Sequence, residues 1–131
     1  MIALLDSYII IDFLKGKQDA ERKIQSLKEK SAEICTSVIN YQEVMKGFTE
    51  EKYREKEGNA EIFFSSILII NYTPNEAKIA LMLESLLGPK GQIIDRFDTM
   101  IAATCLNVKG VLVTRNLKHF HRVPGLKVEV W

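Results

Sequence analysis

The sequence predicts an α/β fold, in which helices cover both faces of a mainly parallel β-sheet. Short apolar runs, typical of buried strands, alternate along the chain with longer amphipathic stretches, typical of helices. One such run, GVLVT at 110–114, is almost continuously apolar, as expected of a strand covered on both faces. With 131 residues, 47% of them hydrophobic, the chain is expected to form one domain spanning 1–131.

The first elements come from the stretch MIALLDSYIIIDFLKGKQ. IALL at 2–5 is expected to be a buried strand, and a helix is expected from Ser7 to about Lys15, where Gly16 ends it. A second, charged and amphipathic helix is expected over 19–30.

The next unit repeats this order of strand and helix. AEICTS at 32–37 indicates a second strand, and either Thr36 or Ser37 can cap the helix that then runs to Gly47. The stretch 50–64 is charged and then apolar, which predicts a helix with a solvated first half.

The third unit begins with ILIINY at 67–72, whose β-branched residues favour a strand. Pro74 suits the first turn of a helix that continues to about Leu87 and ends at GPKG. A further helix is expected over 96–108, with a stripe of apolar side chains facing the core.

The last strands are GVLVT, already described, and the more exposed LKVEV at 126–130. Ligands of open parallel sheets bind beyond the C-terminal ends of the strands. Asp6 ends the first strand and TRN at 114–116 ends the strand at 110–114. These two polar loops, far apart in sequence, are therefore expected to meet at one edge of the sheet.

Composition excludes several classes of protein. The N-terminus lacks a basic region followed by a long apolar stretch, and no apolar run approaches the ~18 residues of a membrane span, so neither a signal peptide nor a membrane segment is expected. Cys35 and Cys105 lie in apolar segments, which predicts reduced core residues and suits a cytoplasmic protein. The net charge is −3 over 1–87 and +4 over 88–131, so the C-terminal third could meet a polyanion.

Three acidic residues stand where chemistry is possible, and each also has an ordinary explanation. Asp6 can cap the helix that follows it, Glu43 can be a solvated helix residue, and Asp98 can complement the positive end of its helix. If the three converge, their carboxylates repel one another unless a divalent cation lies between them. Oxygen ligands favour Mg²⁺ or Mn²⁺ over zinc, and such an ion commonly serves phosphodiester hydrolysis.

Four motifs, in this order, resemble a known family: LLDSYIIIDFLKG, TSVINYQEVMKG, DTMIAAT and VLVTRNLKHFHRVPGLKVEVW. Together they are similar to the PIN-domain ribonucleases, and in particular to the VapC-type toxins of bacterial and archaeal toxin–antitoxin pairs. The likeness extends from residue 2 to 131 and is weakest over 17–33 and 50–90. It implies a PIN-like three-layer α/β/α sandwich with a central, mainly parallel sheet.

The resemblance also implies the site. Asp6, Glu43 and Asp98 match three family acids that hold Mg²⁺ or Mn²⁺, and Asn116 falls where the family often has a fourth Asp. Asparagine removes one negative charge there, which places a second metal ion in doubt. Ser7 matches a family hydroxyl that can orient the first carboxylate.

The activity implied is that of a Mg²⁺-dependent endoribonuclease, which hydrolyses phosphodiester bonds of tRNA, rRNA or mRNA by attack of an activated water. The implied partners are a small cognate antitoxin, with a segment in the acidic groove, and a second copy of the chain. The apolar helix expected at 74–87 could form that homodimer interface.

Several polar residues near these motifs are candidates for supporting roles or RNA contacts: Asp95, Thr114, Arg115 and Lys118. His119 and His121 lie two residues apart but have no partner set typical of zinc. We therefore interpret KHFHR as a surface or RNA-backbone segment and not as a metal site.

Two other classes of function remain open from sequence. The chain could be a catalytically decayed PIN-type module that binds RNA or protein, with Asn116 as the mark of lost metal chemistry. A receiver-like phosphoacceptor is also conceivable, with Asp6 as the modified residue. That fold, however, requires an acidic pair at the end of the first strand, and only Asp6 stands at such a junction.

Overall fold

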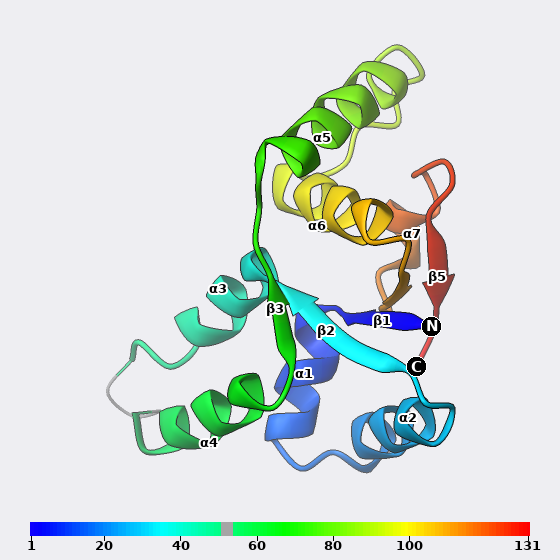
Figure 1. The fold of residues 1–131 in the computed structure, drawn as a ribbon. Helices are drawn as coiled ribbons and strands as arrows, with labels where there is room; N and C mark the ends of the chain where they lie inside the picture. Colours follow the sequence, from blue (N-terminus) through cyan, green and yellow to red (C-terminus); the bar gives the residue numbers. More distant parts are fainter. Residues whose placement is uncertain (51–53) are drawn as a thin grey trace.

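The computed structural model describes residues 1–50 and 54–131, which fold around one five-stranded sheet (Figure 1). The strands lie in the order β3-β2-β1-β4-β5, and every neighbouring pair is parallel. Their bounds are β1 Ile2–Leu5, β2 Glu33–Ser37, β3 Leu68–Ile70, β4 Val111–Val113 and β5 Lys127–Glu129. The predicted parallel sheet is therefore confirmed, with β1 at its centre.

Each predicted helix is present, and one further short helix was not predicted. The helices are α1 Ser7–Leu14, α2 Gln18–Glu29, α3 Val38–Lys46, α4 Arg54–Ser65, α5 Pro74–Leu87, α6 Arg96–Asn107 and α7 Leu117–Phe120. The sequence predicted that one helix would begin at residue 50 and run to 64. Residue 50 is not helical, and residues 51–53 lie outside the described residues. The segment α7 escaped the sequence analysis because four residues are too few for a helical apolar pattern.

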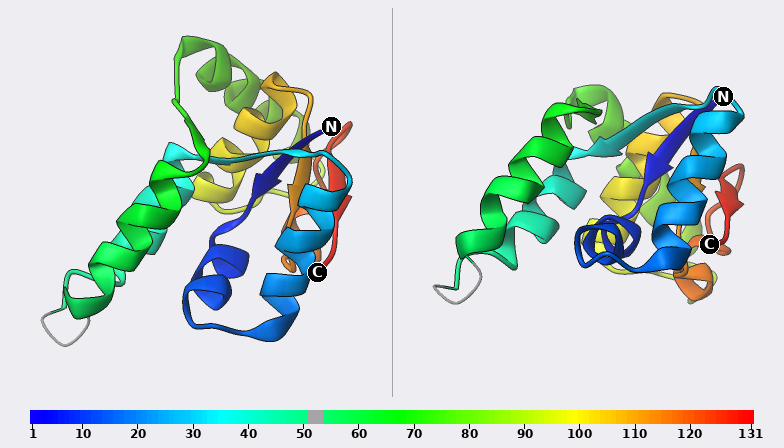
Figure 2. Two further views of the ribbon diagram at one scale, coloured as in Figure 1. Left: turned by 60° about the horizontal axis from the view of Figure 1, so that its bottom comes forward. Right: turned by 90° about the horizontal axis from the view of Figure 1, so that it is seen from below.

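The helices form one layer on each face of the sheet, as the views in Figure 2 show. Leu4 and Leu5, adjacent in β1, are both completely buried but point to opposite faces. Leu4 packs in the core beneath α5 and α6, and Leu5 packs in the core beneath α1, α2 and α4. The α/β/α sandwich is thus confirmed, and α3 contributes Ile39 to one core and Val44 to the other.

Helix α6 is buried on more than the predicted stripe, because α5 packs along its outer side while the sheet covers its inner side. Cys105 on α6 and Cys35 on β2 are free thiols in the same core. Burial raises the pKa of each to about 12, so both thiols stay protonated at neutral pH.

None of the helices in the described part of the chain combines the length and hydropathy that crossing a membrane requires.

Candidate active site

Two neighbouring strands bring the first and last motifs together, as their polar C-terminal loops predicted. Leu5 of β1 pairs with Val113 of β4, so the residues that follow them, Asp6 and Thr114, lie side by side. The Asp6 backbone N–H continues the ladder by donating to the Val113 carbonyl oxygen over 3.0 Å. The site thus lies at the C-terminal edge of the sheet, beside its central strand.

Asp6 is both a helix cap and a member of this site. Its Oδ1 accepts hydrogen bonds from the backbone N–H of Ser7 over 2.9 Å and from Nδ2 of Asn40 over 3.1 Å. Its Oδ2 accepts one from the Thr114 hydroxyl over 2.5 Å. Because Asp6 is only 7% exposed, these donors fix the carboxylate in one orientation.

Asn40 is a site residue that the sequence analysis did not identify. It is completely buried on α3, and its Oδ1 accepts from the hydroxyl of Ser37, the N-cap of that helix, over 2.6 Å. This contact turns the Nδ2 group toward Asp6 and Ser7. A polar residue three positions before Glu43 was the available signal, but spacing alone does not show that it is buried.

Ser7 connects α1 to Glu43 on α3. Its hydroxyl donates to Oε2 of Glu43 over 2.8 Å and accepts from Nδ2 of Asn40 over 2.9 Å. Glu43 itself stands at the solvent-exposed rim, while Ser7 is buried. The hydroxyl therefore ties the exposed Glu43 carboxylate to the buried part of the site.

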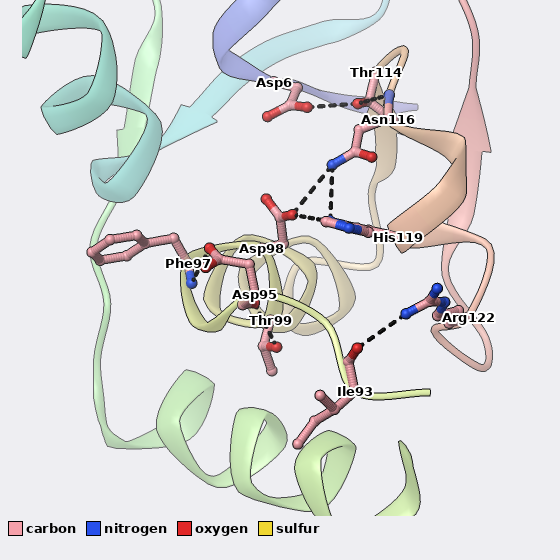
Figure 3. A network of polar contacts seen from close by, with 10 residues as sticks. All are labelled: Asp6, Ile93, Asp95, Phe97, Asp98, Thr99, Thr114, Asn116, His119 and Arg122. Carbon is pink, nitrogen blue, oxygen red and sulfur yellow. Dashed lines mark hydrogen bonds and ion pairs between the residues drawn. The ribbon is translucent and has the colours of Figure 1, made fainter. Parts of the chain in front are cut away.

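Asp98 lies in the first turn of α6, and its Oδ2 faces the loop that follows β4 (Figure 3). Nδ1 of His119 lies 2.6 Å from that oxygen, and Nδ2 of Asn116 lies 3.2 Å from it. Asn116 thus lies beside Asp98, to which it presents its amide nitrogen and not its carbonyl oxygen. His119, which we had assigned to a surface or RNA-backbone segment, also contacts this carboxylate.

The remaining candidates lie around this centre. Asp95 is exposed and caps α6, where its Oδ2 accepts from the backbone N–H of Phe97 over 3.0 Å. Lys118 is exposed on α7. Arg115 is engaged elsewhere: its Nη2 lies 2.6 Å from Oδ2 of Asp19, and its guanidinium carbon lies 3.5 Å from the ring centroid of Trp131.

The three site carboxylates concentrate negative charge. Burial raises the pKa of Asp6, and the charge of Asp98 adds to this, while hydrogen bonds from Thr114, Ser7 and Asn40 act in the opposite direction. Partial burial likewise raises the pKa of Glu43, as do the charges of Asp6, Asp98 and Asp95. Among the described residues, no lysine or arginine forms an ion pair with these three acids, and the basic side chain that contacts one of them is His119, at Asp98.

These residues suit a hard divalent cation. The donor set is rich in carboxylate oxygens, and a cation would offset both causes that raise the pKa of Asp6 and Glu43, their burial first and the repulsion between the acids second. Within the described ranges, no three His, Cys, Asp or Glu side chains already stand close enough to ligate one ion together. A bound ion would therefore retain several waters, as Mg²⁺ commonly does.

The structure is therefore a parallel α/β/α sandwich with acidic side chains at the C-terminal edge of its sheet, and comparison with known proteins assigns this arrangement to a family. The PIN-domain profile matches residues 3–126, so the chain belongs to the PIN-domain family.

Its relatives narrow this assignment to the VapC-type ribonucleases. The chain is 30% identical to "Ribonuclease VapC2" of Rickettsia felis, over 100% of this chain and 98% of that protein. It is 29% identical to the "tRNA(fMet)-specific endonuclease VapC" of Salmonella typhimurium, over 98% of this chain and 96% of that protein.

Solved structures show the same likeness. The crystal structure of VapBC2 from Rickettsia felis, bound to a DNA fragment from its promoter, matches with a TM-score of 0.90 at 28% identity. That match covers 100% of this chain and 99% of the other. The structure of VapBC-1 from nontypeable Haemophilus influenzae matches with a TM-score of 0.84 at 28% identity, covering 100% and 98%.

Proposed function

We propose that this protein is a Mg²⁺-dependent endoribonuclease and the toxin of a toxin–antitoxin pair. The observation that carries the proposal is the group of three acids, Asp6, Glu43 and Asp98, at the sheet edge without a lysine or arginine to neutralise them in the described part of the chain. An enzyme that must hold a divalent cation retains such repulsion at a cost in stability, whereas a purely structural site has no use for it.

Asp6, Glu43 and Asp98 would hold Mg²⁺ or Mn²⁺, with Asn116 in support. When bound, the ion lowers the pKa of water and stabilises the negative charge that develops on the phosphoryl oxygens. Asn40 and Thr114 hold Asp6, and Ser7 holds Glu43, so each carboxylate is kept in a defined orientation at the sheet edge. The nucleophile is water, and a carboxylate at the rim such as Glu43 can accept its proton.

The substrate class we propose is RNA with an exposed single-stranded segment, because an extended strand can reach acids at a sheet edge. Lys118 is exposed on α7, between Asn116 and His119 in sequence, and can contact a phosphate there. Among tRNA, rRNA and mRNA, tRNA is the first to test, since one relative is named a tRNA(fMet)-specific endonuclease. Because tRNA, rRNA and mRNA are cytoplasmic in bacteria, we expect the protein to act in the cytoplasm.

The partner we propose is a small antitoxin, as in the VapBC complexes to which the chain is similar. A pocket of about 370 Å³ beside Glu43 can receive one of its segments. Apolar side chains and two lysines line it, from α1, α3, α4 and the residues just after α1 and α3: Ile11, Leu14, Lys15, Val44, Phe48 and Lys56. A segment with apolar anchors and an Arg or Lys directed at the acids would fill this pocket and block the site.

We also propose a homodimer through α5. Leu81, Met82 and Leu86 are 65%, 51% and 42% exposed, although α5 is otherwise packed against α6. Three large apolar side chains exposed on one helix indicate a protein contact. Pairing of two such helices would remove this apolar surface from water.

The test is cleavage of total cellular RNA by the purified protein with Mg²⁺ or Mn²⁺, beside Asp6→Asn and Asp98→Asn. We expect the wild-type protein to cleave RNA and EDTA to abolish this cleavage. We expect the cleavage rate of each variant to be at least a hundredfold lower than that of the wild type. Cleavage that persists in both variants would contradict the assignment of Asp6 and Asp98 to the active site. RNA binding without any cleavage, unaffected by EDTA, would instead favour a decayed RNA-binding module.

A further inference from the structure

One carboxylate oxygen of the site receives two donors from the same turn. Oδ2 of Asp98 lies 2.6 Å from Nδ1 of His119 and 3.2 Å from Nδ2 of Asn116 (Figure 3). No hydrogen bond among the described residues engages Oδ1 of the same carboxylate. Asp98 is therefore held from one side only.

The two contacts at Oδ2 are those of an acceptor with two donors. The carboxylate oxygen accepts from the Asn116 amide, and it accepts from Nδ1 of His119 in the tautomer that carries hydrogen on that nitrogen. Nδ1 of His119 and Nδ2 of Asn116 lie 3.3 Å apart, but two donors cannot bond to each other. Their proximity reflects convergence on one oxygen.

The turn that carries both donors is tied to the opposite side of the site. The backbone N–H of Asn116 donates to Oγ1 of Thr114 over 3.0 Å, and that hydroxyl donates in turn to Asp6. Phe120, next to His119, is 1% exposed and anchors α7 in the core. The two donors are thus built into a rigid loop.

We propose that His119 and Asn116 are positioning residues that hold Asp98 for a single divalent ion. Their N–H groups direct positive charge at the Oδ2 side of Asp98, so a cation is excluded from that side and must bind at Oδ1. This inference rests on the metal-dependent function proposed above and deepens it: the site takes one ion, and His119 is part of the apparatus that orients a metal-binding carboxylate. Residues that hydrogen-bond a metal ligand typically change metal affinity 10–100-fold when they are removed.

The test is a calorimetric titration of the purified full chain with Mn²⁺, which gives the affinity and the stoichiometry. Thermal melts verify that each variant is folded. The wild-type protein should bind one Mn²⁺. His119→Ala should bind it at least about tenfold more weakly. His119→Asn should retain near wild-type affinity, because its amide Nδ2 can occupy the place of Nδ1. His121→Ala is the matched control, since His121 is exposed two residues further on and should leave the affinity unchanged.

Asn116→Asp tests the exclusion of a second ion. It replaces a donor facing Asp98 with a carboxylate, and we expect the stoichiometry to rise from one Mn²⁺ to two. Two ions in the wild-type protein, or unchanged or tighter binding by His119→Ala, would overturn this inference while leaving the proposed function intact. No bound Mn²⁺ in the wild-type protein would overturn both.

Discussion

The Ser7 hydroxyl donates a hydrogen bond to Oε2 of Glu43 over 2.8 Å, which links the first turn of α1 to the exposed rim of α3. The same hydroxyl accepts from Asn40, whose amide also holds Asp6. One small side chain therefore couples the buried acid of the site to the exposed one. Such shared hydrogen bonds are sensitive to the loss of any single member.

Replacing Ser7 with Ala should lower the RNA cleavage rate at least tenfold, because Glu43 loses its only hydrogen-bond donor among the described residues. It should also lower the free energy of unfolding by about 1 kcal/mol, since the amide of Asn40 loses one acceptor. Single-turnover cleavage and urea denaturation measure the two effects. Ser7→Thr, which keeps the hydroxyl, is the control, and equal rates for Ala and Thr would contradict the role of this hydrogen bond.

Replacing Asn40 with Asp should destabilise the protein by about 3 kcal/mol in EDTA, because it places a second buried carboxylate against Asp6. Urea denaturation measures the change. Gln42→Glu makes the same change of charge on the exposed side of α3 and should have little effect. Equal stability of the Asn40 and Gln42 variants would show that the acids are not close enough to repel.

Stability without metal should depend on pH through Asp6. Its pKa is raised above the ordinary 3.8, so the folded state keeps its proton to a higher pH than the unfolded state does. The contribution of Asp6 to stability is therefore most favourable below that ordinary value. It falls as the pH rises through the folded pKa.

Asp6→Asn should remove this dependence and give a higher Tm than wild type at neutral pH in EDTA, with the difference shrinking as the pH falls toward 3.8. Mg²⁺ should raise the Tm of the wild-type protein and not that of the variant, because a ligand stabilises only the state that binds it. Thermal melts across pH test both effects. If the Tm of the two proteins changed with pH in the same way, this result would contradict a raised pKa of Asp6 in the folded state.

Replacing Arg115 with Ala should lower the Tm by a few degrees. Its guanidinium stacks on the ring of Trp131, and its Nε donates to the Trp131 carbonyl oxygen over 2.8 Å, so it ties the C-terminal residue to the fold. Arg115→Lys should not restore the Tm, because an ammonium group cannot reproduce the planar stacking. Lys118→Ala, nearby and exposed, is the control; if it lowers the Tm as much as Arg115→Ala does, the stacking is not the cause.

Replacing Leu81 and Leu86 with Glu should convert a dimer into a folded monomer, because both side chains are exposed on α5 in the single chain and only the dimer buries them. Light scattering after gel filtration measures the mass. Ile62→Glu, equally exposed on α4, should leave the dimer intact. A wild-type monomer across the accessible concentration range would contradict the proposed interface.

The boundaries and order of the main elements were predictable because they rest on local patterns. The helix beginning at Pro74 was placed correctly to its last residue, Leu87, since a proline start and a glycine end mark it. Either Thr36 or Ser37 could have capped α3, and only the structure decides for Ser37, because the Thr36 hydroxyl instead donates to the carbonyl oxygen of Leu5. That choice depends on the neighbouring strand and not on local sequence.

For the candidate site, the sequence by itself placed Asp6 at the end of a strand and Asp98 at the start of a helix, because strand and helix periodicity are local properties of the chain. That these two acids act together with Glu43 was expected from the resemblance to the PIN-domain ribonucleases. The tertiary structure alone decided that Asn40 supports Asp6, that Asn116 presents a donor to Asp98, and that His119 belongs to the site. The contact between Asp6 and Thr114 spans 108 positions. Contacts across such separations depend on strand order and on the rotation of each helix against the sheet, which no local pattern of residues specifies.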